Sequence, residues 1–423
     1  MGSFARRDSP ADRSLARNRD SPRSFPASLS LQRSNGEVFL KVLFHGWEYP
    51  PQGGGVGAYM RNMARALGEQ GHSAVVVTGR VDGLPEMETT PFGRIYRIYD
   101  RTEIASPRVR DRVLAIARDE AVDLIEGADH LGECASLLRV RDRPPVLIKY
   151  HACQVVRRLL DSHVLHAWQR ITIRLSLWRQ YRQIANERFC IEHADLACVP
   201  TRRLLAEMEK QGLHMPGHMA VIPNPFVTTE VAVGTADVAP EPTILFIGRI
   251  EIGKGIQYLP GILRGVLQRL PSARLDIAGE DTYARGLGSL HTWLAQQFGP
   301  LAGQVRFLGR LGKAELHAAL QRAWVVVVPS RWDNFPTVVL EAMACGKAIV
   351  ASPHGGMPEM LADTGCPIAD PATPLFAREV TTLLDDSARR SAIGESARQR
   401  LASQYAPSAV VPHYIRFVES RCR

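Results

Sequence analysis

The sequence predicts an α/β protein of two domains, each built around a parallel sheet. Short apolar, β-branched segments alternate with helical segments from residue 38 to residue 223, and the same alternation starts again at residue 243. A stretch of Gly, Ala, Pro and acidic residues at 231–242 separates the two series. The length of 423 residues is also typical of two domains of ordinary size.

The first domain is expected at residues 37–225 and the second at 243–406, with a linker at 226–242. In the first domain, a strand at 38–46 leads through a glycine-rich loop into a helix at 56–70. Its other expected strands cover residues 74–78, 95–98, 122–126, 146–150, 195–200 and 219–223. The strands expected in the second domain include residues 243–247, 274–278, 324–328 and 348–351.

Both ends of the chain depart from this alternation. Residues 1–36 are rich in Arg, Ser, Pro and Asp and have almost no apolar periodicity, so we expect a disordered leader. This segment lacks the apolar centre of a secretory signal. Residues 407–423 are expected to form a helix that crosses back onto the first domain.

Composition limits the classes of function that are open to the chain. Hydrophobic residues make up 45% and charged residues 22%, as in globular proteins. No apolar run reaches the ~18 residues of a membrane span, and the seven cysteines form no Cys-x-x-Cys pair. We therefore expect a cytoplasmic protein without disulfides, metal site or cofactor. The net charge of +9 favours anionic partners, but no motif indicates nucleic-acid binding.

The strongest functional signal lies at residues 329–343. Asp333 follows a strand, and Glu341 lies about one turn into the helix that comes next. The crevice at the carboxyl ends of such strands is where open α/β sheets bind ligands. The free amides of Thr337 and Val338 can hold a phosphate, and the two carboxylates can accept hydrogen bonds from sugar hydroxyls. The alternative is a capped helix with two solvated acids, because acid pairs at this spacing are common.

The segment PSRWDNFPTVVLEAMACGKAIVAS resembles the signature of the retaining family 4 glycosyltransferases, Glu-x7-Glu followed by Ala-Met-Ala-x-Gly. Asp333 stands where that family usually has glutamate. Asn334, Phe335 and Pro336 stand where a glycine is more common, and Pro336 removes one possible amide donor. The resemblance implies the GT-B fold, in which two Rossmann-like domains with parallel sheets face each other across a central cleft.

The glycine-rich loop after the first strand supports the same resemblance. Gly53-x-Gly55-x-x-Ala58 formally matches a dinucleotide-binding fingerprint, but the loop is long and contains prolines, and no acid ends the second strand. The segment is more similar to the "GG(V/I)G…Y…L…L…GH" loop of GT-B transferases. There, Gly54 and Gly55 would face the donor phosphates across the cleft.

Motifs in the second half of the chain are also similar to those of the family. Arg249 and Lys254, in a Gly-Arg…Lys-Gly loop between strand and helix, resemble a clamp for a diphosphate. Glu280 is expected at the nucleotide, and residues 305–309 with Leu311 resemble the edge that binds the base. The Gly-Gly-x-Pro-Glu motif ends at Glu359, which we expect to cap or orient rather than react.

The resemblance assigns roles to residues of both domains. His151, at the end of a strand, would face the sugar, Asp333 would bind sugar hydroxyls, and Glu341 would bind the ribose. The implied catalytic residues are His151, Asp333, Arg249 and Lys254. The implied donor-binding residues are Gly54, Gly55, Arg249, Lys254, Glu280, Leu311, Asp333, Asn334, Phe335, Pro336, Thr337, Val338 and Glu341.

A long basic helical stretch is expected at residues 154–193. Its arginines are Arg157, Arg158, Arg170, Arg174, Arg179, Arg182 and Arg188. Two interpretations remain open: a core-facing helix with a solvated basic face, or a helix that contacts anionic lipid through residues 154–190. In the second case the cytoplasmic protein would lie at the inner face of the membrane. The resemblance places this region near the acceptor.

The resemblance implies a retaining, metal-independent enzyme that moves a sugar from a nucleotide-diphosphate sugar to a glycan or lipid-linked acceptor. Its pathway would be polysaccharide or glycoconjugate biosynthesis. Front-face attack needs no enzymic nucleophile, and none is assigned. Two alternatives remain, a sugar-nucleotide epimerase of the same fold and a non-catalytic sugar-nucleotide-binding protein, which the substitution at Asp333 suggests. Analysis of the reaction products distinguishes the three.

Overall fold

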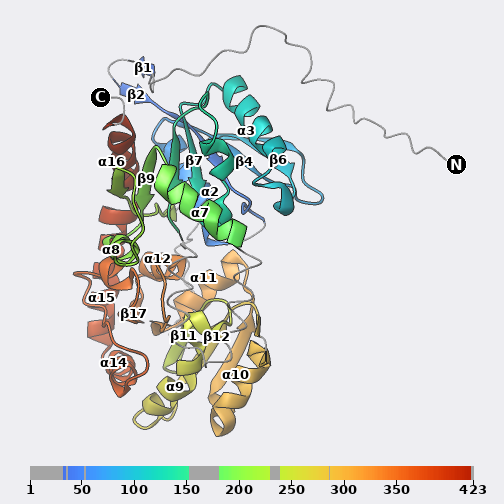
Figure 1. Cartoon of the computed structure of the whole chain (residues 1–423). Helices are drawn as coiled ribbons and strands as arrows, with labels where there is room; N and C mark the ends of the chain where they lie inside the picture. The colour runs from blue at the N-terminus through green and yellow to red at the C-terminus, as the bar shows by residue number, and fades with distance from the viewer. Residues whose placement is uncertain are drawn as a thin grey trace, which may run out of the picture.

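The computed structural model describes residues 32–34, 37–51, 54–151, 181–228, 239–284 and 286–420. These residues form two α/β domains, with the first half of the chain in one domain and the second half in the other (Figure 1). Each domain is built around its own sheet of largely parallel strands, so the predicted fold class is confirmed.

The sheet of the first domain has the strand order β10-β9-β8-β7-β3-β4-β6-β5. Its parallel strands are β3 (Lys41–His45), β4 (Ser73–Gly79), β6 (Gly93–Tyr99), β7 (Leu124–Ala128), β8 (Val146–Lys149), β9 (Leu196–Val199) and β10 (Met219–Val221). Each overlaps with a strand expected from the apolar runs, although the ends differ by a few residues and residues 38–39 of the first expected strand belong to a separate strand, β2 (Glu37–Phe39). At one edge, β5 (Met87–Thr90) pairs antiparallel with β6 and was not expected.

Helices cover both faces of this sheet. Helix α2 (Gly55–Glu69) packs on one face, and α3 (Pro107–Asp119), α7 (Tyr181–His193) and α8 (Arg202–Lys210) pack on the other. Because side chains alternate along a strand, Val146 and Ile148 of β8 are buried on the face covered by α3, α7 and α8. Leu147 is buried on the face covered by α2. The apolar strands are therefore buried on both faces, as parallel strands usually are.

The second domain has a parallel sheet with the strand order β15-β12-β11-β16-β17. These strands are β11 (Thr243–Ile247), β12 (Arg274–Ala278), β15 (Val305–Gly309), β16 (Val325–Val328) and β17 (Ala348–Ala351). Its helices include α9 (Leu259–Leu267), α10 (Leu290–Phe298), α11 (Lys313–Arg322), α12 (Thr337–Ala344), α13 (Met357–Met360), α14 (Pro374–Asp385) and α15 (Ser387–Arg400). One continuous apolar core joins these strands and helices.

Each sheet reverses its strand order at one point. In the first domain the chain moves outward from β3 through β4 and β6, then returns to place β7 on the other side of β3. In the second domain it moves from β11 through β12 and β15, then places β16 on the other side of β11. The loops after these pairs of strands diverge and leave a crevice, which is where open α/β sheets bind ligands.

The end of the chain returns to the first domain. Helix α16 (Pro407–Glu419) lies beside the first domain rather than the second (Figure 1), and its Val410, Val411, Tyr414 and Val418 are buried against α2 and the sheet. A short π-helical turn, η7 (Leu401–Tyr405), precedes α16. There, the amide of Phe226 donates a hydrogen bond to the carbonyl oxygen of Tyr405 at 2.7 Å.

The structure begins slightly earlier than the sequence suggests. Strand β1 (Gln32–Ser34) pairs antiparallel with β2 (Glu37–Phe39), so a hairpin extends into the last residues of the segment that was expected to be disordered. Residues 1–31 lie outside the described residues, as do residues 152–180 of the expected basic helix. Within the described part of the chain, no helix combines the length and apolar character needed to span a membrane.

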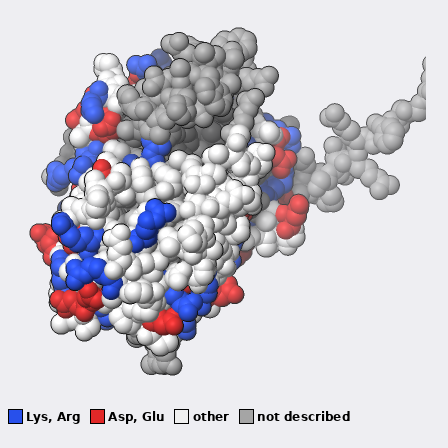
Figure 2. All heavy atoms as spheres, turned by 90° about the horizontal axis from the view of Figure 1, so that it is seen from below, with Lys and Arg blue, Asp and Glu red and all other residues white. Residues whose placement is uncertain are grey.

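The charges on one end of the second domain are mixed. Seen from below, Lys and Arg side chains alternate with Asp and Glu side chains around a largely uncharged face (Figure 2). Nucleic acid is usually held by a continuous basic surface. The described residues on this face do not form one.

Candidate active site

A cleft of about 570 Å³ lies where the switch points of the two sheets face each other. The first domain contributes the loop after β3, the start of α2 and His151, which follows β8. The second domain contributes the loop after β11, the loop after β16 and the start of α12. The cleft therefore brings together residues that are as far apart in the sequence as Glu48 and Glu341, including most of those predicted from motifs.

The predicted clamp residues lie at the second domain's side of this cleft. The Lys254 ammonium group pairs with the Asp333 carboxylate, with 2.5 Å between Nζ and Oδ2, and both side chains are partly buried. The Arg249 guanidinium is more exposed and lies 3.2 Å from the Glu251 carboxylate. A lysine ammonium group that is partly removed from water is stabilised by a negative partner. Asp333 supplies that partner, and an anionic ligand could replace it.

Glycines allow the two loops to pack this closely. Gly255 has a φ of +80°, and a Cβ there would lie 1.9 Å from the Pro329 carbonyl oxygen. Gly355 has a φ of +75°, and a Cβ there would lie 2.1 Å from the Asp333 carbonyl oxygen. The same oxygen accepts a hydrogen bond from the amide of Gly356 at 2.8 Å. The Gly-Gly-x-Pro-Glu motif therefore supports the backbone of the Asp333 loop.

The start of helix α12 faces the cleft. Pro336 is its N-cap residue, so the first helical amides are those of Thr337 and Val338, and both residues line the cleft. Amides at this end of a helix have no acceptor within the helix and favour an anion. Pro336 removes an amide before the helix but none of these two. The predicted phosphate-binding amides are thus placed beside Lys254 and Asp333.

Glu341 lies one turn further along α12, also in the cleft wall. Burial raises the pKa of its carboxyl group to about 7, and the charge of Arg61 partly opposes this increase. A carboxyl group in a cleft, with a pKa close to neutral, is often a functional acid. In this position it can accept hydrogen bonds from hydroxyl groups of a ligand.

His151 forms part of the opposite wall. Its backbone amide donates a hydrogen bond to Asp129 Oδ1 at 3.0 Å, and its ring meets the ring of Tyr59 edge-on at 4.7 Å. The Nε2 atom is buried and has no hydrogen-bond partner among the described residues. Burial, together with the nearby Lys149 and His130, holds the pKa of His151 well below its usual value. The ring is therefore a neutral imidazole with one nitrogen that a ligand could satisfy.

Asn334 joins the two domains behind the cleft. Its side-chain amide donates a 2.6 Å hydrogen bond to the His151 carbonyl oxygen, and its Oδ1 accepts one from the Trp332 indole at 2.6 Å. It is not among the described residues that line the cleft. Its polar groups are already engaged, so its place in the predicted donor-binding set is that of a residue holding His151 and the Asp333 loop together. Phe335, its neighbour, does line the cleft.

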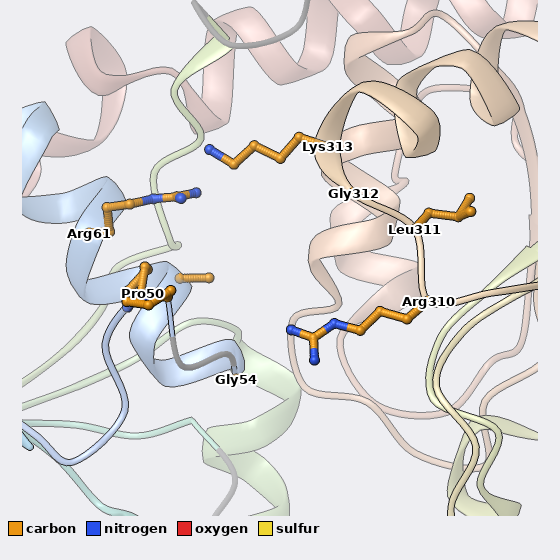
Figure 3. Close-up of a pocket in the computed structure, with 9 residues that line it drawn as sticks. Pro50, Gly54, Arg61, Arg310, Leu311, Gly312 and Lys313 are labelled. Atoms are coloured by element: carbon orange, nitrogen blue, oxygen red, sulfur yellow. The ribbon is translucent and has the colours of Figure 1, made fainter. Parts of the chain in front are cut away.

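Leu311 and Glu280 lie next to the cleft rather than in its lining. Leu311 contributes to an adjacent cavity of about 510 Å³, which shares Gly54 with the cleft. In this cavity the side chains of Arg61 and Lys313 extend toward each other from opposite domains, and Arg310 extends into the same gap (Figure 3). Glu280 is exposed and lies 3.7 Å from Arg310.

Sequence motifs missed Glu48, which occupies the start of helix α2. Its carboxylate accepts hydrogen bonds from the amides of Val56 and Gly57, and a Cβ on Gly54 would lie 1.9 Å from it. Burial raises the pKa of Glu48, while Arg101 and Arg249 oppose the increase. Gly54 therefore makes room for an internal carboxylate, whereas Gly55 faces open space. The signal that could have found Glu48 is its position directly after β3, at the switch point.

Another acid, Glu359, connects the two domains. Glu359 Oε2 accepts hydrogen bonds from the amides of Arg202 at 2.9 Å and Arg203 at 3.4 Å. These amides open helix α8 of the first domain, so Glu359 caps it, as expected. Within the described residues, no group of three His, Cys, Asp or Glu side chains could hold a metal ion.

Two family models match the chain, one in each domain. Residues 53–230 match the model described as "Glycosyltransferase Family 4", and residues 235–400 match the model described as "Glycosyl transferases group 1". The chain belongs to the family 4 glycosyltransferases. The resemblance inferred from the Asp333–Glu341 segment is thereby confirmed, and the two matches divide the chain between the two sheets.

Individual relatives and solved structures match over most of their length. A glycogen synthase of Mycobacterium tuberculosis is 28% identical over 409 residues, covering 86% of this chain and 91% of the relative. Sucrose-phosphate synthase from Thermosynechococcus elongatus aligns with a TM-score of 0.74 at 20% identity, covering 90% of this chain and 98% of that chain. Anabaena Alr3699/HepE in complex with UDP-glucose aligns with a TM-score of 0.69 at 18% identity, covering 90% and 100%. These structural likenesses establish the GT-B fold.

Proposed function

We propose that this family 4 glycosyltransferase moves a sugar from a nucleotide-diphosphate sugar to a glycan or lipid-linked acceptor, with retention of anomeric configuration. The observation that carries the proposal is the pairing of Lys254 with Asp333 beside the free amides of helix α12. A cation, a helix start and a carboxylate are thus concentrated at one switch point. This combination suits a ligand that has both phosphate and hydroxyl groups.

The donor diphosphate would bind at the second domain's side of the cleft. Lys254 and Arg249 would contact its oxygens together with the amides of Thr337 and Val338. As the bond to the sugar breaks, negative charge develops on the leaving diphosphate, and fixed cations and amides stabilise that charge. This set of groups supports a reaction that needs no metal ion.

The sugar and the nucleoside would lie on either side of the diphosphate. When the diphosphate replaces Asp333 as the partner of Lys254, the Asp333 carboxylate becomes available to accept hydrogen bonds from sugar hydroxyls. His151, a neutral imidazole in the opposite wall, can make a further hydrogen bond to the sugar. Glu341 would accept hydrogen bonds from the ribose, and the base would lie toward the cavity that contains Leu311. No side chain is assigned as a nucleophile, which fits front-face attack.

The direct test is a screen of nucleotide sugars for release of free nucleotide diphosphate, with and without candidate acceptors. UDP-glucose is the first donor to use, because the HepE structure was solved with it. A transferred sugar with the donor's anomeric configuration supports the proposal. An epimerised free sugar would instead support the epimerase alternative, and binding without turnover of any donor would support a regulatory protein.

The proposed role of Glu341 predicts that donor binding depends on pH. Only the carboxylate can accept hydrogen bonds at both of its oxygens, and its pKa of about 7 means that protonation begins near neutral pH. At a pH roughly one unit below this pKa, most Glu341 side chains are protonated and cannot bind the donor as a carboxylate. We expect the dissociation constant for the donor to be about tenfold higher there than at a pH where Glu341 is ionised. Calorimetric titration at several pH values measures this change.

The variant Glu341→Gln serves as the control for this pH series. Its side chain cannot titrate, so its donor affinity should be weaker than that of the wild type and nearly constant over the same pH range. Any change that remains in the variant belongs to the ligand or to other residues. A wild-type profile as flat as that of the variant would show that Glu341 does not contact the donor in its ionised form.

A further inference from the structure

A cluster of ionisable side chains is buried beneath helices α2 and α16. Glu126 of β7 and Lys149 of β8 are 2% and 1% exposed, and they lie among the apolar residues of that core. Glu126 accepts hydrogen bonds from two tyrosines, Tyr59 of α2 at 2.6 Å and Tyr414 of α16 at 2.5 Å. Tyr414 therefore reaches a carboxylate that lies 288 positions away in the sequence.

The strand periodicity explains why these groups share one face. Residues two apart in a strand point the same way, so Lys149 lies on the same face of β8 as Leu147, under α2 and α16. His151 follows two positions later, where the strand ends at the cleft. Lys149 Nζ donates a 2.5 Å hydrogen bond to the carbonyl oxygen of Ile222 and lies 5.1 Å from the centre of the Tyr59 ring.

Such a cluster is costly for a protein that needs only stability. A buried carboxylate loses its hydration and must regain it from hydrogen bonds, and apolar residues of similar size usually stabilise a core as well or better. Here each carboxylate oxygen of Glu126 accepts a hydrogen bond from a tyrosine hydroxyl. What the cluster fixes in return is the position of the Tyr59 side chain, which is tied at its hydroxyl to the sheet.

Tyr59 connects this cluster to the cleft. Its ring lines the cleft and meets the His151 ring edge-on at 4.7 Å with an interplanar angle of 61°. A tyrosine that shifted or rotated would leave His151 without its neighbour on that side. The contacts thus run from Tyr414 through Glu126 to Tyr59 and end at the imidazole whose Nε2 has no partner within the described protein.

We propose that Tyr414 is a positioning residue, which holds His151 in its sugar-facing orientation through Glu126 and Tyr59. The inference rests on the proposed function, in which His151 faces the donor sugar. Helix α16 follows the second domain in the chain but packs on the first domain. It therefore supports the wall of the cleft that the first domain forms. A chain that ends before α16 lacks this wall's support, even though all the donor-binding motifs are present.

The variant Tyr414→Phe tests the proposal with the full-length protein, because it removes one hydroxyl and keeps the ring. We expect kcat for the donor reaction to fall about tenfold, as when a catalytic group loses an orienting hydrogen bond to a charged residue, with KM for the donor unchanged within about twofold. The matched control is Tyr96→Phe. Tyr96 also donates a 2.6 Å hydrogen bond to a glutamate, Glu120, but lies in β6 away from His151.

The pH profile separates positioning from loss of stability. Glu126 is faced by Tyr59 from α2, Lys149 from β8, Cys198 from β9 and Tyr414 from α16. Burial raises the pKa of Glu126, and the two tyrosine hydroxyls and Lys149 oppose the increase. Removing one hydroxyl raises the pKa further, so kcat of Tyr414→Phe should decline at a higher pH on the acid side than kcat of the wild type. A variant that is only less stable would keep the wild-type profile.

A second measurement does not depend on activity. With histidine-labelled protein, the His151 ring resonance is identified by its absence in His151→Asn, and Tyr414→Phe should shift it while Tyr96→Phe leaves it in place. An unshifted resonance together with wild-type kcat would overturn the inference. If the wild type turns over no nucleotide sugar but the resonance still shifts, the proposed function fails and the contact chain from Tyr414 to His151 is retained.

Discussion

Replacing Lys254 with alanine should reduce turnover by about 10²-fold or more, the loss expected when a fixed stabiliser of a developing oxyanion is removed. Lys254 is the cation that the second domain places beside the start of α12, where the leaving diphosphate would lie. The loss should occur mainly in kcat, because the negative charge on the leaving group is greatest in the transition state. Release of free nucleotide diphosphate from saturating donor measures it.

The variant Lys210→Ala is the control for this experiment. Lys210 ends helix α8, its side chain is 74% exposed, and its ion pair with Glu207 is on the surface. Its removal changes the net charge by the same amount, so a general electrostatic effect would appear in both variants. Turnover of Lys254→Ala within threefold of wild type would rule out the diphosphate clamp.

The strands and their loops could be predicted because they depend on local pattern. The run Val325–Val328 is buried on both faces of the second sheet, and such runs are recognisable without any partner. Parallel strands also fix the side of the sheet at which the next loop emerges. The clamp loop and the Asp333 loop therefore lie together at the switch point, as their motifs suggested.

Strand β5 could not be predicted for the opposite reason. Its sequence, Met-Glu-Thr-Thr, has alternating exposure at the edge of the sheet and contains no apolar run. Its strand conformation comes from pairing with β6. A strand of this kind is defined by its neighbour and not by its own composition.

The residues that the sequence did not reveal act through contacts between distant segments. The Glu48 carboxylate lies at the start of α2 because the loop after β3 folds over that end of the helix. Asn334 was expected to bind the donor, but its amide group reaches across to His151, 183 positions earlier. The pairing of Tyr414 with Glu126 depends on α16 returning to the first domain. No short motif encodes contacts of this length.

Replacing Asp333 with asparagine should separate binding of the donor sugar from binding of the nucleotide. The Asp333 carboxylate pairs with Lys254 in the structure, so a bare nucleotide diphosphate has to displace it. Asparagine keeps the size of the side chain but removes the charge. We therefore expect the affinity for the bare nucleotide diphosphate to stay within about threefold of wild type or to increase, because Lys254 no longer has a competing anion.

The same substitution should reduce turnover of the nucleotide sugar by about 10²-fold, because an amide cannot accept hydrogen bonds from sugar hydroxyls at both positions as a carboxylate does. Asp276→Asn is the control, since Asp276 also pairs with a cation of the second domain, Arg306, but in β12 away from the cleft. Calorimetry with both ligands and the rate of nucleotide release give the two quantities. An equal loss of affinity for both ligands would place Asp333 at the diphosphate alone. The presence of aspartate at position 333, in place of the family's usual glutamate, would then have to be explained by the packing of this loop against Gly355. That contact is made by the Asp333 backbone and not by its carboxylate.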